Sequence, residues 1–151
     1  ILEDESRNIG SRHLPIPLTD AMNRSPMVLI ELSFDERIEK LFQEYVIDRY
    51  QKTLAYEEEN ADGIFADFLT ASLLRLKKRL GDQRTTHILK LMKKALQIQH
   101  EDNFNHHREW LIAITKDYYD PMYLYQLKKR EQKIVFKGNH QSIKEWLSEL
   151  P

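Results

Sequence analysis

The residues best suited to chemistry lie near the start of the chain, in EDESR, where Glu3, Asp4 and Glu5 precede Ser6 and Arg7. An apolar strand that ends in carboxylates is typical of sites that hold a metal ion or position a water. In mononucleotide-binding sheets such an acid holds Mg²⁺ on the phosphates that a Walker A loop cradles. On a strand Glu3 and Glu5 point to one face and Asp4 to the other, so the three cannot all serve one ion. One carboxylate at the end of the strand is enough for this role.

Two arginines follow these acids. Arg7 and Arg12 could clamp a diphosphate through bidentate hydrogen bonds, although a plain ion pair with a glutamate is the alternative. The sequence contains no GxxxxGK[ST] loop, which is the other half of a phosphate site of this kind. Spacing alone therefore favours the ion pair.

A second group of charged residues lies between Leu73 and Ala95, where Asp82 is the only acid among eight lysines and arginines. Helical spacing places six of these bases, three on each helix, opposite the apolar residues of two helices that meet at Gly81. Two basic stripes on one hairpin form an electrostatic footprint for phosphates, whereas a solvated face normally mixes both signs. We therefore favour contact with a nucleic-acid backbone. The predicted contact residues are Arg75, Lys78, Arg79, Arg84, Lys90, Lys93 and Lys94.

Histidines and tyrosines support weaker predictions. No HExxH motif or cysteine accompanies the six histidines, and the neighbours His106 and His107 point about 100 degrees apart on a helix. We expect histidines at the surface or at interfaces rather than a metal site. Base stacking is conceivable for the tyrosines around Asp120-Pro121, but packing at a helix joint is the more common use. These tyrosines are Tyr118, Tyr119, Tyr123 and Tyr125.

Composition predicts a folded chain without cysteine chemistry. Its 151 residues are 41% hydrophobic and 10% aromatic, which is too apolar for a disordered segment. The net charge of -1 hides a polarised distribution, because the acids are concentrated in residues 31–67. The absence of cysteine excludes disulfides, thiolate metal sites and a thiol nucleophile within this chain. The longest apolar run is too short to cross a bilayer and no leader precedes it, so we expect no membrane contact and a cytoplasmic location.

Hydrophobic periodicity predicts the elements that must position these residues. Residues 1–52 are predicted as strand, loop, strand and helix. The second strand, 27–32, is apolar enough to be covered on both faces in a parallel sheet. Ser33 and Glu36 form a capping box that opens a helix over residues 34–50.

The rest of the chain is predicted to be mainly helical. A helix over 61–80 ends at Gly81, and Asp82 caps its successor, so that the two form a hairpin. A helix over 104–119 is ended by Asp120-Pro121, which starts another. A strand over 133–137, a turn at Gly138-Asn139 and a short closing helix complete the chain.

Several separated stretches together resemble the C-terminal part of bacterial tRNA 2-selenouridine synthase. They are LEDESRNIGSRHLP, SPMVLIELSFDERIEKLFQEYV, RLGDQR, the WL of HREWL, YYDPMYLYQL and IVFKGNHQSIKEWL, in order along nearly the whole chain. EDESRNIG and YYDPMY are the most specific. The resemblance implies that wobble 2-thiouridine of tRNA is geranylated from geranyl diphosphate. It further implies that selenium from selenophosphate then replaces the geranylthio group.

The resemblance also implies which parts of the enzyme this sequence lacks. The family carries an N-terminal rhodanese-like domain with a reactive cysteine and a P-loop domain, and neither that cysteine nor the Walker A motif occurs here. We therefore expect no catalytic residue in this fragment and no activity from it alone.

Site residues can be transferred from the family through EDESR. The resemblance implies that Asp4 and Glu5 bind Mg²⁺ and that Arg7 and Arg12 bind phosphate oxygens. Arg37, in the DER that opens the long helix, is a further phosphate candidate. An ion pair of Arg37 with Glu39 or with a neighbour of Glu36 is the alternative.

Together these inferences predict a helix-rich α/β fold, with part of a P-loop-type parallel sheet and an appended helical subdomain. We divide the chain into the end of the P-loop-like domain (1–52), a basic-faced helical subdomain (53–130), and a return strand with a closing helix (131–151). The strand around Val135 is expected to rejoin the sheet. Two alternatives stay open, a self-standing helical RNA-binding module and an interaction domain that docks an acidic protein.

Overall fold

The chain, described here from a computed structural model for residues 2, 8–9 and 12–149, divides by packing into two compact units. Unit 1 comprises residues 1–31 and 129–151, and unit 2 comprises residues 32–128. No helix in the described part of the chain is both long enough and apolar enough to cross a bilayer.

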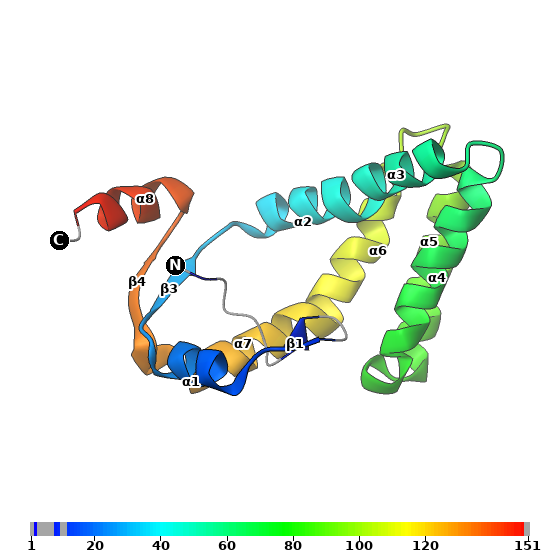
Figure 1. Ribbon diagram of the computed structural model, residues 1–151. Helices are drawn as coiled ribbons and strands as arrows, with labels where there is room; N and C mark the ends of the chain where they lie inside the picture. The colour runs from blue at the N-terminus through cyan, green and yellow to red at the C-terminus, as the bar shows by residue number, and fades with distance from the viewer. Residues whose placement is uncertain (1, 3–7, 10–11, 150–151) are drawn as a thin grey trace. The chain divides into compact units, whose positions relative to one another are not determined.

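Unit 2 consists of helices, and Figure 1 labels them along the chain. One long helical segment contains α2 (Phe34–Phe42), the π-helical turn η1 (Gln43–Ile47) and α3 (Asp48–Tyr56). The next two helices, α4 (Ala61–Leu80) and α5 (Asp82–Ile98), form the predicted hairpin. A second long segment contains α6 (His107–Ile114), the π-helical turn η2 (Thr115–Tyr119) and α7 (Asp120–Lys129).

The predicted capping box opens the first segment. Ser33 Oγ accepts a hydrogen bond from the Glu36 backbone N–H, and a Glu36 carboxylate oxygen accepts one from the Ser33 backbone N–H at 2.8 Å. The helix then continues beyond the predicted end near residue 50 to Tyr56. A π-helical turn inside the segment preserves helical geometry, so no chain break separates α2 from α3.

Asp120-Pro121 was predicted to end one helix and start another, but it does not interrupt the second segment. The chain stays helical from α6 into α7, with η2 immediately before Asp120. Proline lacks the N–H that an α-helix needs, and a π turn is one of the local adjustments that lets a helix pass such a residue. The predicted start of this segment at residue 104 is also too early, because Phe104 has a φ of 64° and lies outside α6.

The core of unit 2 joins all of its long helices. Buried apolar residues recur along α4 at 65, 69 and 73 and along α5 at 88, 92 and 95, which is the spacing of one face of an amphipathic helix. They pack with the first segment and with α6 in one cluster. The cluster comprises Phe42, Val46, Phe65, Leu69, Leu73, Leu80, Ile88, Met92, Ala95, Trp110, Leu111 and Ile114.

Within its described residues, unit 1 contains two small sheets. Strands β1 (Asn8–Ile9) and β2 (Arg12–His13) pair antiparallel, and β3 (Met27–Ile30) pairs in parallel with β4 (Ile134–Gly138). The return of the late strand to the sheet is therefore confirmed. Helix α8 (His140–Ser148) packs on this pair, with the Phe136 and Trp146 rings stacked at 5.0 Å, and a 3₁₀ turn, η3 (Glu131–Lys133), precedes β4.

One prediction in unit 1 is wrong, and a second stays a prediction. The predicted loop between the first two strands contains helix α1 (Ile16–Arg24), whose start was hidden by prolines that the first helical turn tolerates. Strand β3 is not covered on both faces, since none of its residues is buried and Ile30 is 48% exposed. In the described residues β3 has one neighbouring strand, so the expectation of a strand enclosed in a larger sheet is not met here.

The architecture is helix-rich with a parallel pair of strands, as expected, while its assignment to the P-loop type stays a prediction. Packing divides the chain at other positions than the proposed domain limits at 52/53 and 130/131. The helix that begins at Phe34 belongs to unit 2, because Phe42 and Val46 lie in the helical core.

Candidate nucleic-acid interface

The turn of the α4–α5 hairpin depends on one glycine. Gly81 has a φ of 82°, a conformation that residues with a Cβ rarely adopt. Its carbonyl accepts the Thr85 N–H at 3.1 Å, so Gly81 both ends α4 and caps α5. Asp82 is the first residue of α5 rather than its predicted cap, and its carboxylate pairs instead with Lys77 at 3.0 Å. The hairpin thereby brings the last turn of α4 beside the first turn of α5.

All seven predicted contact residues of this hairpin are exposed, and we call them the basic hairpin set. They are Arg75, Lys78 and Arg79 on α4 and Arg84, Lys90, Lys93 and Lys94 on α5. A shallow pocket at the turn is lined partly by members of the set, Arg75 and Lys78, together with Leu74, Lys77, Gly81 and Asp82. The structure thus presents the predicted cations to solvent on two adjacent helices.

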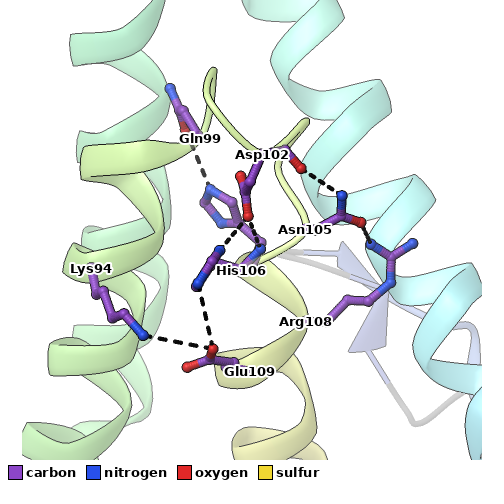
Figure 2. Close-up of polar contacts among 8 residues, drawn as sticks. Lys94, Gln99, Asp102, Asn105, His106, Arg108 and Glu109 are labelled. Atoms are coloured by element: carbon purple, nitrogen blue, oxygen red, sulfur yellow. Dashed lines mark hydrogen bonds and ion pairs between the residues drawn. The ribbon is translucent and has the colours of Figure 1, made fainter.

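Three members of the set are anchored to the second long segment. Arg79 Nη1 donates to the Tyr118 hydroxyl at 3.3 Å, and Arg84 Nη1 donates to the Asp117 carbonyl oxygen at 3.3 Å. Lys94 pairs with Glu109 at 3.8 Å, a contact that Figure 2 shows. In contrast, no acid in the described part of the chain pairs with Lys78, Lys90 or Lys93. Those three ammonium groups remain available to an external anion.

The predicted metal and phosphate residues are only partly described. Asp4, Glu5 and Arg7 lie outside the described residues. Arg12 is exposed on β2, where it pairs in register with Ile9. Among the residues that the structure describes, no group of three or more histidine or acidic side chains could hold a metal ion.

Arg37 forms a two-point ion pair across unit 2. Its Nη1 contacts Asp120 Oδ1 and its Nη2 donates to Asp120 Oδ2 at 3.0 Å. The hydrogen bond that Arg37 donates to Asp120 raises the pKa of Arg37. The partner is neither Glu39 nor a neighbour of Glu36, and Glu39 instead accepts from Arg108 at 2.8 Å. Tertiary contacts between α2 and the second segment have replaced the pairing within one helix that the sequence offered.

A buried polar network, which the sequence did not predict, lies at the other end of unit 2. His107 is completely buried, so the expectation of a surface or interfacial histidine is wrong at this position. Trp110 Nε1 donates to His107 Nδ1 at 2.9 Å, and an indole N–H can only donate. His107 Nδ1 is therefore unprotonated, and its Nε2–H donates to Gln99 Oε1 at 3.3 Å.

The network ends on a carboxylate. Gln99 Nε2 donates to Asp62 Oδ1 at 2.9 Å, and His100 Nε2 lies 3.0 Å from both Asp62 oxygens. Although burial opposes it, hydrogen bonds from His100 and Tyr50 lower the pKa of Asp62. Burial and the hydrogen bond to Asp62 raise the pKa of Tyr50 to about 12. One polar chain thus links α3, α4, α5 and α6.

The connection from α5 to α6 is held by a second set of contacts, drawn in Figure 2. Asp102 accepts from the His106 backbone N–H at 2.8 Å and contacts His106 Nδ1 through the same oxygen. Asn103 and Phe104 both have positive φ values, which non-glycine residues adopt only under strong local constraint. Asp102 fixes the end of this connection, because its carboxylate binds both the backbone N–H and the imidazole of His106, the residue before α6.

Acidification should destabilise unit 2. Burial lowers the pKa of His107 from 6.5 to about 4, so the unfolded chain binds a proton between these pH values that the folded chain does not. The contribution of neutral His107 to the unfolding free energy is therefore fully present above pH 6.5. It is lost as the pH falls towards 4, by about 3 kcal/mol in total. Denaturant unfolding between about pH 7.5 and pH 4.5 measures this loss. In His107→Phe the unfolding free energy should fall less steeply as the pH is lowered. An unchanged dependence on pH would contradict the assignment of this loss to His107.

The tyrosine cluster is only partly a packing joint. Tyr118 and Tyr119 are half-buried against the core, whereas Tyr123 and Tyr125 are exposed. The prediction of packing is confirmed for the first two and wrong for the last two. Nothing in the sequence pattern distinguished them, because all four lie within one helical stretch.

Comparison with known proteins gives one consistent result. A family model described as the tRNA 2-selenouridine synthase AAA domain matches residues 1–150. Among the similar curated proteins, tRNA 2-selenouridine synthases from Aeromonas salmonicida and Azotobacter vinelandii are 42% and 39% identical to the chain, each over 99% of its length. The match covers 41% of each relative, so the chain spans about two fifths of their length. No solved structure matches.

Proposed function

The chain belongs to the tRNA 2-selenouridine synthase family, and on that premise we propose that it is the tRNA-holding and phosphate-binding part of an enzyme that places selenium in tRNA. In the proposed reaction, the sulfur of wobble 2-thiouridine displaces diphosphate from geranyl diphosphate. Selenium from selenophosphate then takes the place of the geranylthio group. We place the reaction in the cytoplasm and assign the rhodanese cysteine and the Walker A loop to the rest of the protein.

The observation that carries this proposal is the exposure of the basic hairpin set. Seven cationic side chains on two adjacent helices match the negatively charged backbone of RNA, and three of them, Lys78, Lys90 and Lys93, have neither a hydrogen bond nor an ion pair in the described residues. These contacts position an RNA without reading its sequence. The hairpin would therefore hold tRNA while the chemistry takes place elsewhere in the enzyme.

The small parallel sheet of unit 1 supports a second element of the proposal. Ile30 on β3 and Val135 on β4 are 48% and 54% exposed, although such side chains in a parallel sheet are normally covered. We propose that strands β3 and β4 belong to a P-loop-type sheet whose remaining strands lie elsewhere in the protein.

Asp4 and Glu5 would hold Mg²⁺ beside that P-loop. Carboxylate oxygens are the ligands that Mg²⁺ prefers, and the bound ion would neutralise charge on a departing diphosphate. Arg7 and Arg12 would bind phosphate oxygens through their planar guanidinium groups. Arg37 would join them only by exchanging Asp120 for phosphate, since both of its outer nitrogens now contact that carboxylate.

The test is conversion of tRNA by the whole protein. A tRNA that carries 2-thiouridine is incubated with geranyl diphosphate and selenophosphate, and its nucleosides are identified by mass spectrometry. We expect 2-selenouridine from the wild type and at least a roughly tenfold lower rate from Asp4→Asn or Glu5→Gln, with tRNA affinity unchanged. Exposed Asp35→Asn, which also removes one carboxylate charge, is the matched control. Wild-type rates in both test variants would remove the acids from the site and favour a self-standing RNA-binding module.

A further inference from the structure

Helix α7 presents aromatic side chains to solvent. None of its residues is buried, and Tyr123 is 63% exposed. Leu124 and Tyr125 are exposed to nearly the same extent. Tyr45, on η1, is also exposed. Groups of exposed large apolar side chains mark interaction sites, because their burial by a partner is favourable.

The rings near the start of α7 support one another. Tyr119 and Tyr123 are stacked, with ring centroids 6.3 Å apart and planes 24° from parallel. Tyr118 meets Tyr119 edge-on at 5.0 Å. Because Tyr119 packs on the core of unit 2, it supports one side of the Tyr123 ring, while most of Tyr123 stays open to solvent. A ring fixed in this way loses little side-chain entropy when a flat partner stacks on it.

Cations of the basic hairpin set adjoin these rings. The Arg79 guanidinium donates to the Tyr118 hydroxyl, and Arg84 donates to the carbonyl of Asp117, each at 3.3 Å. Both contacts tie the hairpin turn to η2. The one acid in the sequence of α7, Asp120, is already paired with Arg37. The tyrosines of η2 therefore lie beside two guanidinium groups of the basic hairpin set.

The tyrosine hydroxyls of this surface do not repel an anionic partner. Burial raises the pKa of Tyr119, with smaller contributions from Tyr45 and Tyr118. Burial likewise raises the pKa of Tyr45. Both side chains remain neutral at physiological pH, so a phosphate backbone approaching them meets no negative charge from these rings.

We propose that Tyr119 and Tyr123 form a stacking platform for an unpaired base of the bound RNA, with Arg79 and Arg84 beside the adjoining phosphates. Aromatic side chains next to a cationic groove are the usual means of binding unpaired nucleotides. This inference rests on the proposed function, in which the hairpin holds the tRNA backbone. A stacking platform suits such an enzyme, because a nucleotide that is to be modified must leave its base stack.

The experiment compares three variants of the whole protein on two RNAs. The RNAs are a substrate tRNA with unpaired loops and a blunt duplex of two fully complementary strands. Tyr123→Ala removes the ring and Tyr123→Phe keeps it, while Leu124→Ala removes an equally exposed apolar side chain from the same helix. We expect Tyr123→Ala to lose about fivefold to a hundredfold in tRNA affinity. The other two variants should stay within about twofold of wild type, and all three should bind the duplex normally.

Three outcomes would overturn the proposal. Wild-type tRNA affinity in Tyr123→Ala would show that no base stacks there. An equal loss in Leu124→Ala would identify an apolar surface that docks another part of the protein. An equal loss on the duplex would show that unpaired bases are not involved. Failure of the hairpin itself is distinguishable, since reversing the charge of Lys78, Lys90 and Lys93 would then leave tRNA binding unchanged whatever Tyr123→Ala does.

Discussion

Reversing the charge of Lys78, Lys90 and Lys93 together should weaken tRNA binding by the whole protein about a hundredfold or more at roughly 0.1 M salt. Each lysine that neutralises a phosphate releases a counterion. For each such contact, a tenfold fall in salt concentration below about 1 M raises the affinity by nearly a factor of ten. These three lysines are exposed and have no acidic partner among the described residues. The slope of log affinity against log salt should become shallower by about 3. Fluorescence anisotropy with labelled tRNA at several salt concentrations measures both effects.

Lys94 is left unchanged in this variant because it pairs with Glu109, so its reversal would also perturb α6. Lys52→Glu, Lys137→Glu and Lys144→Glu make a matched control, since these exposed lysines lie outside the hairpin and their reversal changes the net charge by the same amount. Equal losses of affinity in the test and control variants would mean that net charge, and not the hairpin, attracts tRNA. A test variant that binds like wild type would refute the hairpin as the interface.

Removing the buried imidazole in His107→Ala should cost about 3–5 kcal/mol of unfolding free energy. The substitution leaves a cavity among Phe65, Phe104 and Trp110, whose rings surround His107. It also leaves the Trp110 indole N–H and the Gln99 carbonyl oxygen without their partners in a buried position. Denaturant unfolding of the 151-residue chain at about pH 7.5, in a Trp146→Phe background, reports the effect through Trp110 fluorescence.

Two further variants separate the contributions to that loss. His107→Phe fills most of the cavity but restores neither hydrogen bond, so about 1–3 kcal/mol of the loss should remain. His87→Ala on α5 removes an exposed imidazole and should change stability by less than about 0.5 kcal/mol. A loss below about 1 kcal/mol in His107→Ala would mean that water or a neighbouring side chain satisfies the two groups.

Local rules predicted the helices of unit 2 and their inner faces well. The capping box of Ser33 and Glu36, the end of α4 at Gly81 and the buried positions of α4 and α5 follow from spacing within a few turns of chain. Helix α1 and the passage through Pro121 were missed for a related reason. Proline excludes some backbone hydrogen bonds but not all of them, and only the surrounding structure determines which geometry absorbs it.

Partners of charged and polar groups were predicted less well. The arginine at position 37 had acids within its own helix, yet it binds Asp120, which is 83 positions away in the sequence. Similarly, Gln99 directly follows α5 and Asp62 lies on α4, and their contact becomes visible only when α4 and α5 are packed together. Side chains of this length reach several candidates, so sequence spacing cannot select among them.

The sequence by itself determined which residues are basic, which helix faces are apolar, and the family through its ordered motifs. Those properties depend on residue type and on helical periodicity, which is fixed by local backbone geometry. Only the tertiary structure decided that His107 is buried and neutral, that Lys78, Lys90 and Lys93 lack acidic partners in the described chain, and that Tyr123 is open while Tyr119 packs. Burial and pairing are properties of the space between elements, and that space exists only after the helices have packed.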